Sequence, residues 1–337
     1  MKLLRYNRST EPVTTARLGM LLPGDLVGDM RAGYARYLVE KKGDGQGREV
    51  ASLRMQPHIV AFLAIGSPGW EAAMATQDYL TALARDERSA AGLEGEPLFT
   101  PLAECRLHAA VKPSKVIAVG RNYAEHLRET GTKIDSKVPS AWIKANSTII
   151  GPTRDIVKPA ATQELDYETE LAIVIGKRCR DVPEARAFEV IAGYAVMNDV
   201  SARDVVRIER KEGNQLLGKM FDGFAPLGPW LVTRDEIPDP QNLRIITRVN
   251  GEVRQNGNTR DMIWPIPKLI AYLSQMTLEP GDVISTGTPE GVAMGRKAGL
   301  PSWFLNEGDV LESEVEKVGV LRNRIIAEPA KEASWKW

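Results

Sequence analysis

The feature that most constrains this chain is the segment 163–176, which begins polar and acidic and ends in an apolar run. The run Leu171 to Ile175 is rich in β-branched residues and stops at a glycine, which is typical of a strand that enters the core and ends in a turn. Because side chains alternate along a strand, Glu168 and Glu170 project from the same face. The sequence therefore predicts two carboxylates side by side where a strand enters the core.

Neighbouring carboxylates on one strand face, about 7 Å apart between Cβ atoms, repel each other unless a positive group lies between them. Asp166 lies on the same face as Glu168 and Glu170. Carboxylate oxygens suit Mg²⁺, Mn²⁺ or Ca²⁺, so a hard cation is the natural candidate. The alternative is a solvated acidic strand end, and this segment alone does not decide between the two.

The composition excludes several classes of protein. The 337 residues include 44 Lys and Arg and 44 Asp and Glu, so no excess charge points to a nucleic-acid or membrane-surface partner. The two cysteines, Cys105 and Cys179, cannot form a disulfide framework and indicate a reducing compartment. The N-terminus lacks the apolar core of a signal peptide, and the apolar run 59–65 is too short to span a bilayer. We expect a cytoplasmic protein.

The pattern of expected elements divides the chain into two domains. Residues 1–105 are expected to form a small α+β domain, with two short strands around Pro23 and Gly24 and an amphipathic helix over 70–85. The residues of this helix expected to face the core are Trp70, Met74, Leu80 and Leu83. Residues 106–337 carry many short strands and few helices, which favours a strand-rich α+β fold over a doubly wound one. No P-loop, dinucleotide fingerprint or zinc-ligand spacing occurs in the chain.

A candidate general base follows the expected buried strand 115–120. The segment 121–129 reads as a turn and a short helix, on which His126 and Glu129 share one face. A carboxylate beside an imidazole fixes its tautomer and raises its basicity, whereas an exposed pair would be worth only a few tenths of a kcal/mol. The turn before the helix carries adjacent polar side chains beside free backbone N–H groups, namely Arg121, Asn122 and Tyr123.

Further candidate groups follow along the chain. The strand 194–199 would deliver Asp199 at its end, either as a third carboxylate or as the N-cap of a helix that begins near Ser201. Lys219 lies in a loop rich in glycine, proline and aromatic residues, where most lysines are surface residues. In the glycine-rich loop after the strand near 283, Thr286, Thr288 and exposed amides provide groups for a carboxylate. Two further elements are expected: a hairpin at Asn250-Gly251 and a helix over 265–276 with Met276 facing inward.

These segments, in this order, resemble the fumarylacetoacetate hydrolase family. The matching stretches lie at 120–126, 166–176, 193–204, 218–230, 249–252 and 278–292. The resemblance covers roughly residues 112–328, and the first hundred residues resemble the variable leader domain of longer members more weakly. It implies a mixed β-roll or sandwich as the catalytic domain, an Mg²⁺ or Mn²⁺ enzyme that acts on 2-oxo acids, and a homodimer.

The resemblance also implies a role for each matching residue. The metal carboxylates fall on Glu168, Glu170 and Asp199, the base pair on His126 and Glu129, the site lysine on Lys219, and the substrate-carboxylate loop on Thr286, Gly287 and Thr288. We assign Arg121, Asn122 and Tyr123 to substrate binding as well. One departure is Val206, where many members carry a glutamine that contacts the substrate or a lid. The stretch 293–304 is longer than minimal and is expected to shape the pocket.

The first expected reaction is hydrolysis of a C–C bond in a 2,4-dioxo acid of the acylpyruvate or fumarylacetoacetate type. It gives pyruvate or a related oxo acid and a carboxylic acid, a reaction of aromatic catabolism. Decarboxylation of an oxaloacetate-type acid and isomerisation of 2-hydroxyhepta-2,4-diene-1,7-dioate would use the same metal and base. A binding module without turnover is a further alternative, but it would not need the His126–Glu129 pair.

Overall fold

The computed structural model describes residues 1–86, 90–132, 136–296 and 303–329. Of the stretch 293–304, expected to shape the pocket, residues 297–302 lie outside the described part. Among the described residues, no single helix is long and apolar enough to cross a membrane, although the bent pair formed by helices 59–65 and 67–86 passes on length and composition alone.

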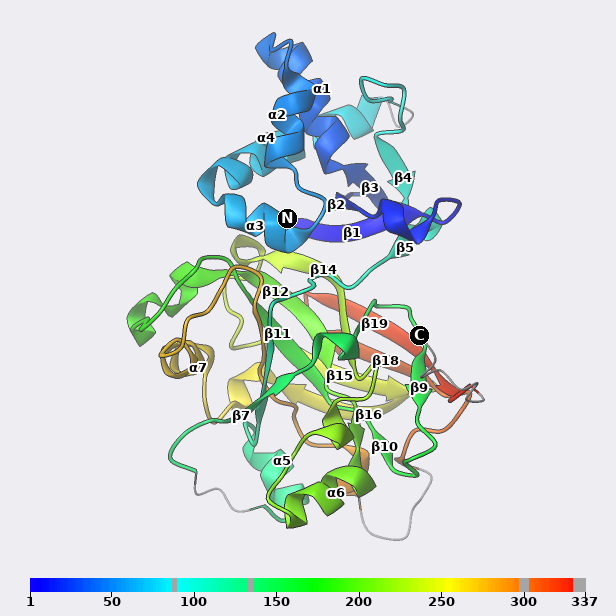
Figure 1. The fold of residues 1–337 in the computed structure, drawn as a ribbon, viewed down its shortest axis with the longest axis vertical. Helices are drawn as coiled ribbons and strands as arrows, with labels where there is room; N and C mark the ends of the chain where they lie inside the picture. The colour runs from blue at the N-terminus through cyan, green and yellow to red at the C-terminus, as the bar shows by residue number, and fades with distance from the viewer. Residues whose placement is uncertain (87–89, 133–135, 297–302, 330–337) are drawn as a thin grey trace, which may run out of the picture.

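A large mixed sheet forms the centre of the molecule (Figure 1). Its main path runs β4-β3-β2-β1-β14-β12-β11-β17-β6-β7. The bounds of these strands are β1 (Lys2–Arg8), β2 (Arg17–Leu22), β3 (Leu26–Asp29), β4 (Phe99–Pro101), β6 (Val116–Gly120), β7 (Ser140–Lys144), β11 (Thr169–Ile175), β12 (Ile191–Asn198), β14 (Ala225–Thr233) and β17 (Val283–Ser285). Every residue of β11 is buried, so the strand that the sequence predicts to enter the core does so.

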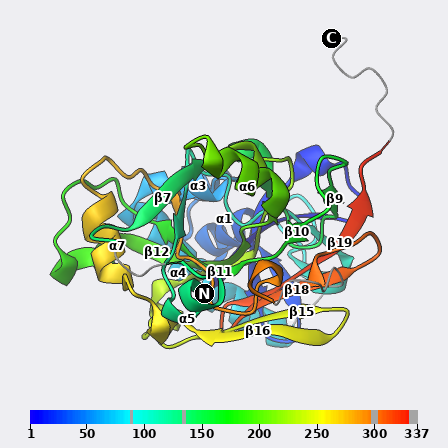
Figure 2. The same ribbon diagram turned by 90° about the horizontal axis from the view of Figure 1, so that it is seen from below.

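Strand directions place several chain segments at one end of this sheet. β11 is antiparallel to both of its neighbours, β12 and β17, and β17 is parallel to β6. The start of β11 therefore lies beside the ends of β12, β17 and β6. Helix α5 (Ala124–Glu129) follows β6, and helix α6 (Arg203–Lys211) follows β12 at this end. Seen from below, α5 and α6 lie on opposite sides of β11 (Figure 2).

A second sheet packs against the first. Its order is β16-β15-β18-β19-β9, with bounds β9 (Ile156–Lys158), β15 (Arg244–Val249), β16 (Glu252–Asn258), β18 (Val310–Val315) and β19 (Gly319–Ala327). The expected hairpin is present, because Asn250 and Gly251 both adopt positive φ angles between β15 and β16. Ile173 of β11 shares a core cluster with Ile245 and Val315 of this sheet. The strand-rich α+β class is therefore confirmed.

The N-terminal region continues the large sheet, because β1 pairs with β14. Figure 1 shows its helices together at one end of the molecule, far from α5 and α6. They are α1 (Met30–Lys42), α2 (Gly47–Arg54), α3 (Ile59–Ile65) and α4 (Ser67–Asp86). The Asp29 side chain caps α1 by accepting hydrogen bonds from the backbone N–H groups of Arg31 and Ala32.

Two of the inward-facing assignments are wrong. Met74 of α4 is 52% exposed, because the small residues Ala72, Ala73 and Thr76 form the buried face instead. Met276 is 42% exposed, because helix α7 (Ile266–Leu273) ends before it is reached.

Candidate active site

The register of β11 and β12 brings a third carboxylate to the two glutamates. Thr169 lies opposite Asn198 in the ladder, so the next positions, Glu168 and Asp199, also face each other, and the Asp199 amide donates to the Glu168 carbonyl at 2.9 Å. Ligand oxygens of Glu168, Glu170 and Asp199 all lie within 4.8 Å of one another, and all three residues are buried. The structure therefore brings the predicted metal-binding carboxylates together and excludes a solvated strand end.

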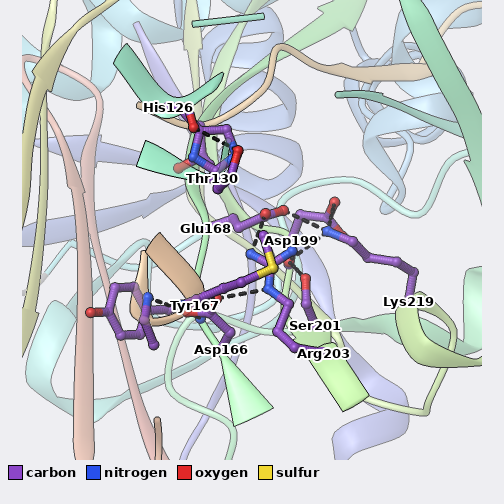
Figure 3. A network of polar contacts seen from close by, with 12 residues as sticks. His126, Thr130, Asp166, Tyr167, Glu168, Asp199, Ser201, Arg203 and Lys219 are labelled. Carbon is purple, nitrogen blue, oxygen red and sulfur yellow. Dashed lines mark hydrogen bonds and ion pairs between the residues drawn. The ribbon is translucent and has the colours of Figure 1, made fainter. Parts of the chain in front are cut away.

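Two lysines and an arginine surround this triad, where they offset buried negative charge. Lys219 Nζ donates to Glu168 Oε2 at 2.5 Å and to Asp199 Oδ2 at 2.8 Å. Lys144 Nζ donates to Asp199 Oδ1 at 2.6 Å. Arg203 Nη2 donates to Glu168 Oε1 at 2.5 Å. Figure 3 shows Lys219 reaching Glu168 and Asp199, and Arg203 reaching Glu168 from the side of Asp166. Two of the three carboxylates thus have cationic partners.

Asp166, the third acidic residue on the predicted strand face, has a different role. It lies on the short strand β10 (Leu165–Asp166), and its Oδ2 accepts from Arg203 Nε at 2.7 Å. Its Oδ1 accepts from the backbone N–H groups of Tyr167 and Ala293, each at 2.8 Å. These bonds orient Arg203 toward Glu168 and tie down the chain after the glycine-rich loop.

Glu170 is the triad member without a cation. Among the described residues, no lysine or arginine forms an ion pair with it. It accepts hydrogen bonds from the Ser285 hydroxyl and, at 2.9 Å, from the Gly287 amide. Burial, and then the charges of Asp199 and Glu168, raise the pKa of Glu170 well above its ordinary value. For Glu168, burial opposes ionisation, but the Arg203 and Lys219 charges outweigh it and hold the pKa well below the ordinary value.

The residues present fit a divalent cation. Two of the three buried carboxylates have cationic partners, but Glu170 has none among the described residues, so one further positive charge would stabilise the cluster. Hard cations prefer carboxylate oxygens as ligands. Glu168, Glu170 and Asp199 would hold the ion.

The predicted base pair is formed and is held on both sides. His126 Nδ1 lies 2.9 Å from Glu129 Oε1, and Glu129 Oε2 accepts from the Gly291 amide at 2.9 Å. The two side chains are 12% and 17% exposed, so this is not a solvated surface pair. With Nδ1–H donating to Glu129, the neutral imidazole keeps its free lone pair on Nε2. His126 lies near enough to Glu168 that its imidazolium form would help to lower the pKa of that carboxyl.

A cavity of about 80 Å³ lies between the triad and the base pair. Glu168, Glu170, His126 and Lys219 line its inner part, and Leu127, Trp142 and Met294 contribute to its walls. Its solvent-exposed part is lined by Arg121, Arg210 and Gln215. In Figure 3, His126 lies on one side of Glu168, and Arg203 and Asp166 lie on the other.

The expected substrate-binding residues separate into two groups. Arg121 and Thr288 line the cavity. Asn122 is fully buried, and its side chain bonds the Thr286 carbonyl at 2.7 Å and both backbone groups of Trp264. Tyr123 is 1% exposed and packs in the core.

The predicted carboxylate loop is itself held to β11. The Thr286 hydroxyl donates to the Leu171 carbonyl at 2.9 Å, and the Gly287 amide is bound to Glu170. In this structure these groups fix the loop onto β11, the strand that carries Glu170.

Sequence reasoning missed several residues at the site. Lys144, Trp142, Arg210 and Gln215 reach it only through the folding of the chain, and no local motif distinguishes them. Arg203 lies within a matched stretch, but its ion pairs needed the structure. Val206, which replaces the family's frequent glutamine, is 2% exposed and does not line the cavity. Gln215, in contrast, is among the residues that line the cavity.

A larger hollow of about 580 Å³ lies in the N-terminal region. Several of its charged residues pair with one another, such as Arg8 and Arg17 with Glu11. Its lining carboxylates do not form a metal-binding group, and no histidine lines it among the residues that the structure describes, so we assign the chemistry to the smaller cavity.

Residues 115–326 match the family model described as fumarylacetoacetate (FAA) hydrolase C-terminal. The chain belongs to the fumarylacetoacetate hydrolase family. The human protein named oxaloacetate tautomerase FAHD2A, mitochondrial, is 46% identical over 229 residues, which cover 67% of this chain and 71% of that protein.

Proteins of the family with solved structures are named for other activities. The 2-hydroxyhepta-2,4-diene-1,7-dioate isomerase from Mycobacterium marinum is 38% identical, with a TM-score of 0.59, over 68% of this chain and 81% of that chain. The maleylpyruvate hydrolase from Sphingobium sp. SYK-6, in complex with manganese(II) ion and pyruvate, is 29% identical, with a TM-score of 0.67, over 97% and 99%. Similar members of one family are thus named as a tautomerase, an isomerase and a hydrolase.

Proposed function

We propose that this protein catalyses keto–enol tautomerisation of a short 2-oxo acid, with oxaloacetate as the first candidate. The observation that carries the proposal is the size of the cavity between the base pair and the triad, about 80 Å³. Pockets for drug-sized ligands span roughly 300–1,000 Å³. The smaller space here therefore favours a compact acid over one with a long acyl group.

The chain supplies the groups for moving a proton at C3. His126, oriented by Glu129 through Nδ1, takes the proton from C3 on Nε2, and the C–H electron pair becomes the C2–C3 double bond of the enolate. The same imidazolium then returns the proton to the C2 oxygen, so no atom is gained or lost. A divalent cation held by Glu168, Glu170 and Asp199 would supply Lewis-acid charge that favours the enolate. The Lys219 ammonium adds positive charge beside it.

The name of the human relative supports this order of candidates. The second candidate is hydrolysis of a C–C bond in an acylpyruvate-type acid, in which His126 would take a proton from water instead of from carbon. The neighbour named as a maleylpyruvate hydrolase, with its manganese ion and pyruvate, favours it. Decarboxylation of oxaloacetate is a third candidate at the same site, in which the C3–C4 bond would break to release CO₂ and leave the enolate of pyruvate. Mg²⁺ and Mn²⁺ are both proposed as the ion.

The test is a metal-free preparation reconstituted with Mn²⁺ or Mg²⁺ and given enol-oxaloacetate and acetylpyruvate in parallel. We expect metal-dependent loss of the enol absorbance, and a rate for His126→Gln lower by roughly 10²- to 10⁴-fold with metal content unchanged. Arg128→Gln, on the same helix but exposed and paired with Glu125, should behave as the wild type. Release of acetate and pyruvate as the main reaction would favour the hydrolase candidate, and an unaffected His126→Gln would remove the base from the mechanism.

Two other expectations stay predictions. The cytoplasmic location comes from the sequence, and relatives include both a mitochondrial human protein and a Burkholderia cenocepacia protein named a putative hydrolase. Homodimerisation comes from the family resemblance alone.

A further inference from the structure

The exposed part of the cavity carries a cationic group that the tautomerase mechanism leaves unused. We infer that Arg210, oriented by Gln215, binds a second carboxylate of the substrate, so that the substrate is a 2-oxo dicarboxylic acid. The inference rests on the proposed function of this site, because it concerns the far end of the same substrate.

Helix α6 carries two arginines to the cavity for different purposes. Arg203 and Arg210 are seven residues apart, about two turns, and so share one face of the helix. Both line the cavity. Arg203 is 3% exposed, and Asp166 and Glu168 hold its guanidinium. Arg203 therefore balances the charge of the acidic residues at the inner end of the cavity. Arg210 remains available to bind a ligand in the exposed part of the cavity.

Arg210 has a neutral partner where a carboxylate would be expected. Its Nε and Nη2 both donate to Gln215 Oε1, at 3.1 and 3.0 Å. In the described part of the chain, no aspartate or glutamate forms an ion pair with it. Arg207, on the same helix, is paired with Glu164. An amide fixes the plane of the guanidinium without neutralising it, so the charge and the Nη1 donors stay available for a ligand.

The surrounding charges also favour an anion at this position. Burial, and then the charge of Arg203, lower the pKa of the Arg210 guanidinium; the Glu168 charge opposes this, and Arg121 lowers the pKa further. Arg121 lines the same part of the cavity and is exposed. Positive groups that repel one another are stabilised by an anion between them, and the planar guanidinium suits a carboxylate in particular. With one carboxylate of the substrate at the triad, the second would lie at Arg210.

The test compares two ligands that do not react and differ only in this carboxylate. Malate and 2-hydroxybutanoate both have four carbons and a 2-hydroxy acid end, but only malate has a carboxylate at C4. Binding would be measured by titration calorimetry in the presence of MnCl₂. We expect the wild type to bind malate roughly ten- to a hundredfold more tightly, the range for a charge-assisted hydrogen bond of about 1.5–3 kcal/mol.

Variants then locate the source of this preference. Arg210→Met should remove the preference for malate by lowering the affinity for malate alone. The affinity for 2-hydroxybutanoate should stay within about twofold of the wild-type value. Lys211→Met is the control, because Lys211 is exposed, adjacent and outside the cavity lining, and its loss changes the net charge equally. Gln215→Leu should lower the affinity for malate less than Arg210→Met does, because the Arg210 guanidinium keeps its charge and loses only the hydrogen bonds that orient it.

Equal weakening of both ligands by Arg210→Met, or malate affinity unchanged from the wild type, would overturn the inference. An unaffected Gln215→Leu would overturn the orienting role of the amide. The result is separable from the tautomerase proposal, since binding needs no turnover. If the protein prefers malate but does not turn over oxaloacetate, the proposed reaction is wrong and the second-carboxylate site is supported. If the protein turns over oxaloacetate but shows no preference for malate, the proposed reaction is supported and the second-carboxylate site is wrong.

Discussion

Glu168 and Glu170 lie two residues apart and are proposed to hold the same ion, yet their replacement by glutamine should affect the metal-free protein in different ways. Glu168→Gln leaves Arg203 and Lys219 without the charge that both of them contact. Glu170→Gln removes a carboxylate that has no cationic partner among the described residues, and the new side chain keeps an oxygen for the Ser285 and Gly287 donors.

The magnitudes follow from the buried ion pairs. Removing one partner of a buried pair costs about 3–5 kcal/mol. With an unfolding entropy of about 2.1 cal/mol/K per residue, a chain of 337 residues loses about 1.4 °C of Tm for each kcal/mol. Metal-free Glu168→Gln should therefore melt roughly 4–7 °C below the wild type, whereas Glu170→Gln should melt at or above the wild-type temperature. Mn²⁺ at about a hundredfold its Kd adds about 2.7 kcal/mol, or roughly 4 °C, to the wild type only.

The assay is thermal unfolding of the wild type and both variants, in EDTA and in Mn²⁺, with bound metal measured by equilibrium dialysis. Both variants should lose the Mn²⁺-dependent increase in Tm and the bound ion. A metal-free Glu170→Gln as unstable as Glu168→Gln would refute the charge assignment within the triad. A metal-dependent increase in Tm that survives in either variant would refute the metal site itself.

Three further predictions concern the supports of the site and the N-terminal region. Lys144→Met removes a buried partner of Asp199 and should lower the Tm of the metal-free protein more than that of the Mn²⁺-loaded protein; equal losses would show that Lys144 does not balance the triad. Asn122→Ala should lower the unfolding free energy by roughly 2–4 kcal/mol in chemical denaturation, because its amide holds three backbone groups; a loss below about 1 kcal/mol would contradict this. Burial lowers the pKa of His108, so the unfolded chain binds its proton first and stability should fall as the pH drops through about 6.5; His108→Gln should flatten this pH dependence, and an unchanged slope would show that another group causes it.

The sequence by itself determined the features that depend on local backbone geometry. Glu168 and Glu170 share a face because a strand repeats every two residues, and β11 is buried because its apolar run is continuous. His126 and Glu129 meet because residues three apart are neighbours on a helix. The hairpin at Asn250-Gly251 follows from residues that tolerate positive φ angles.

Only the tertiary structure decided which distant groups meet. Asp199 reaches Glu168 through the register of β11 and β12, and Lys144 reaches Asp199 from a strand at the sheet edge. Which carboxylate would lack a cation, and which arginine of α6 would be left with a neutral amide, depended on packing between segments far apart in the chain. Local periodicity fixes where a side chain points, but its partner is set by strand register and by the charges that folding buries beside it.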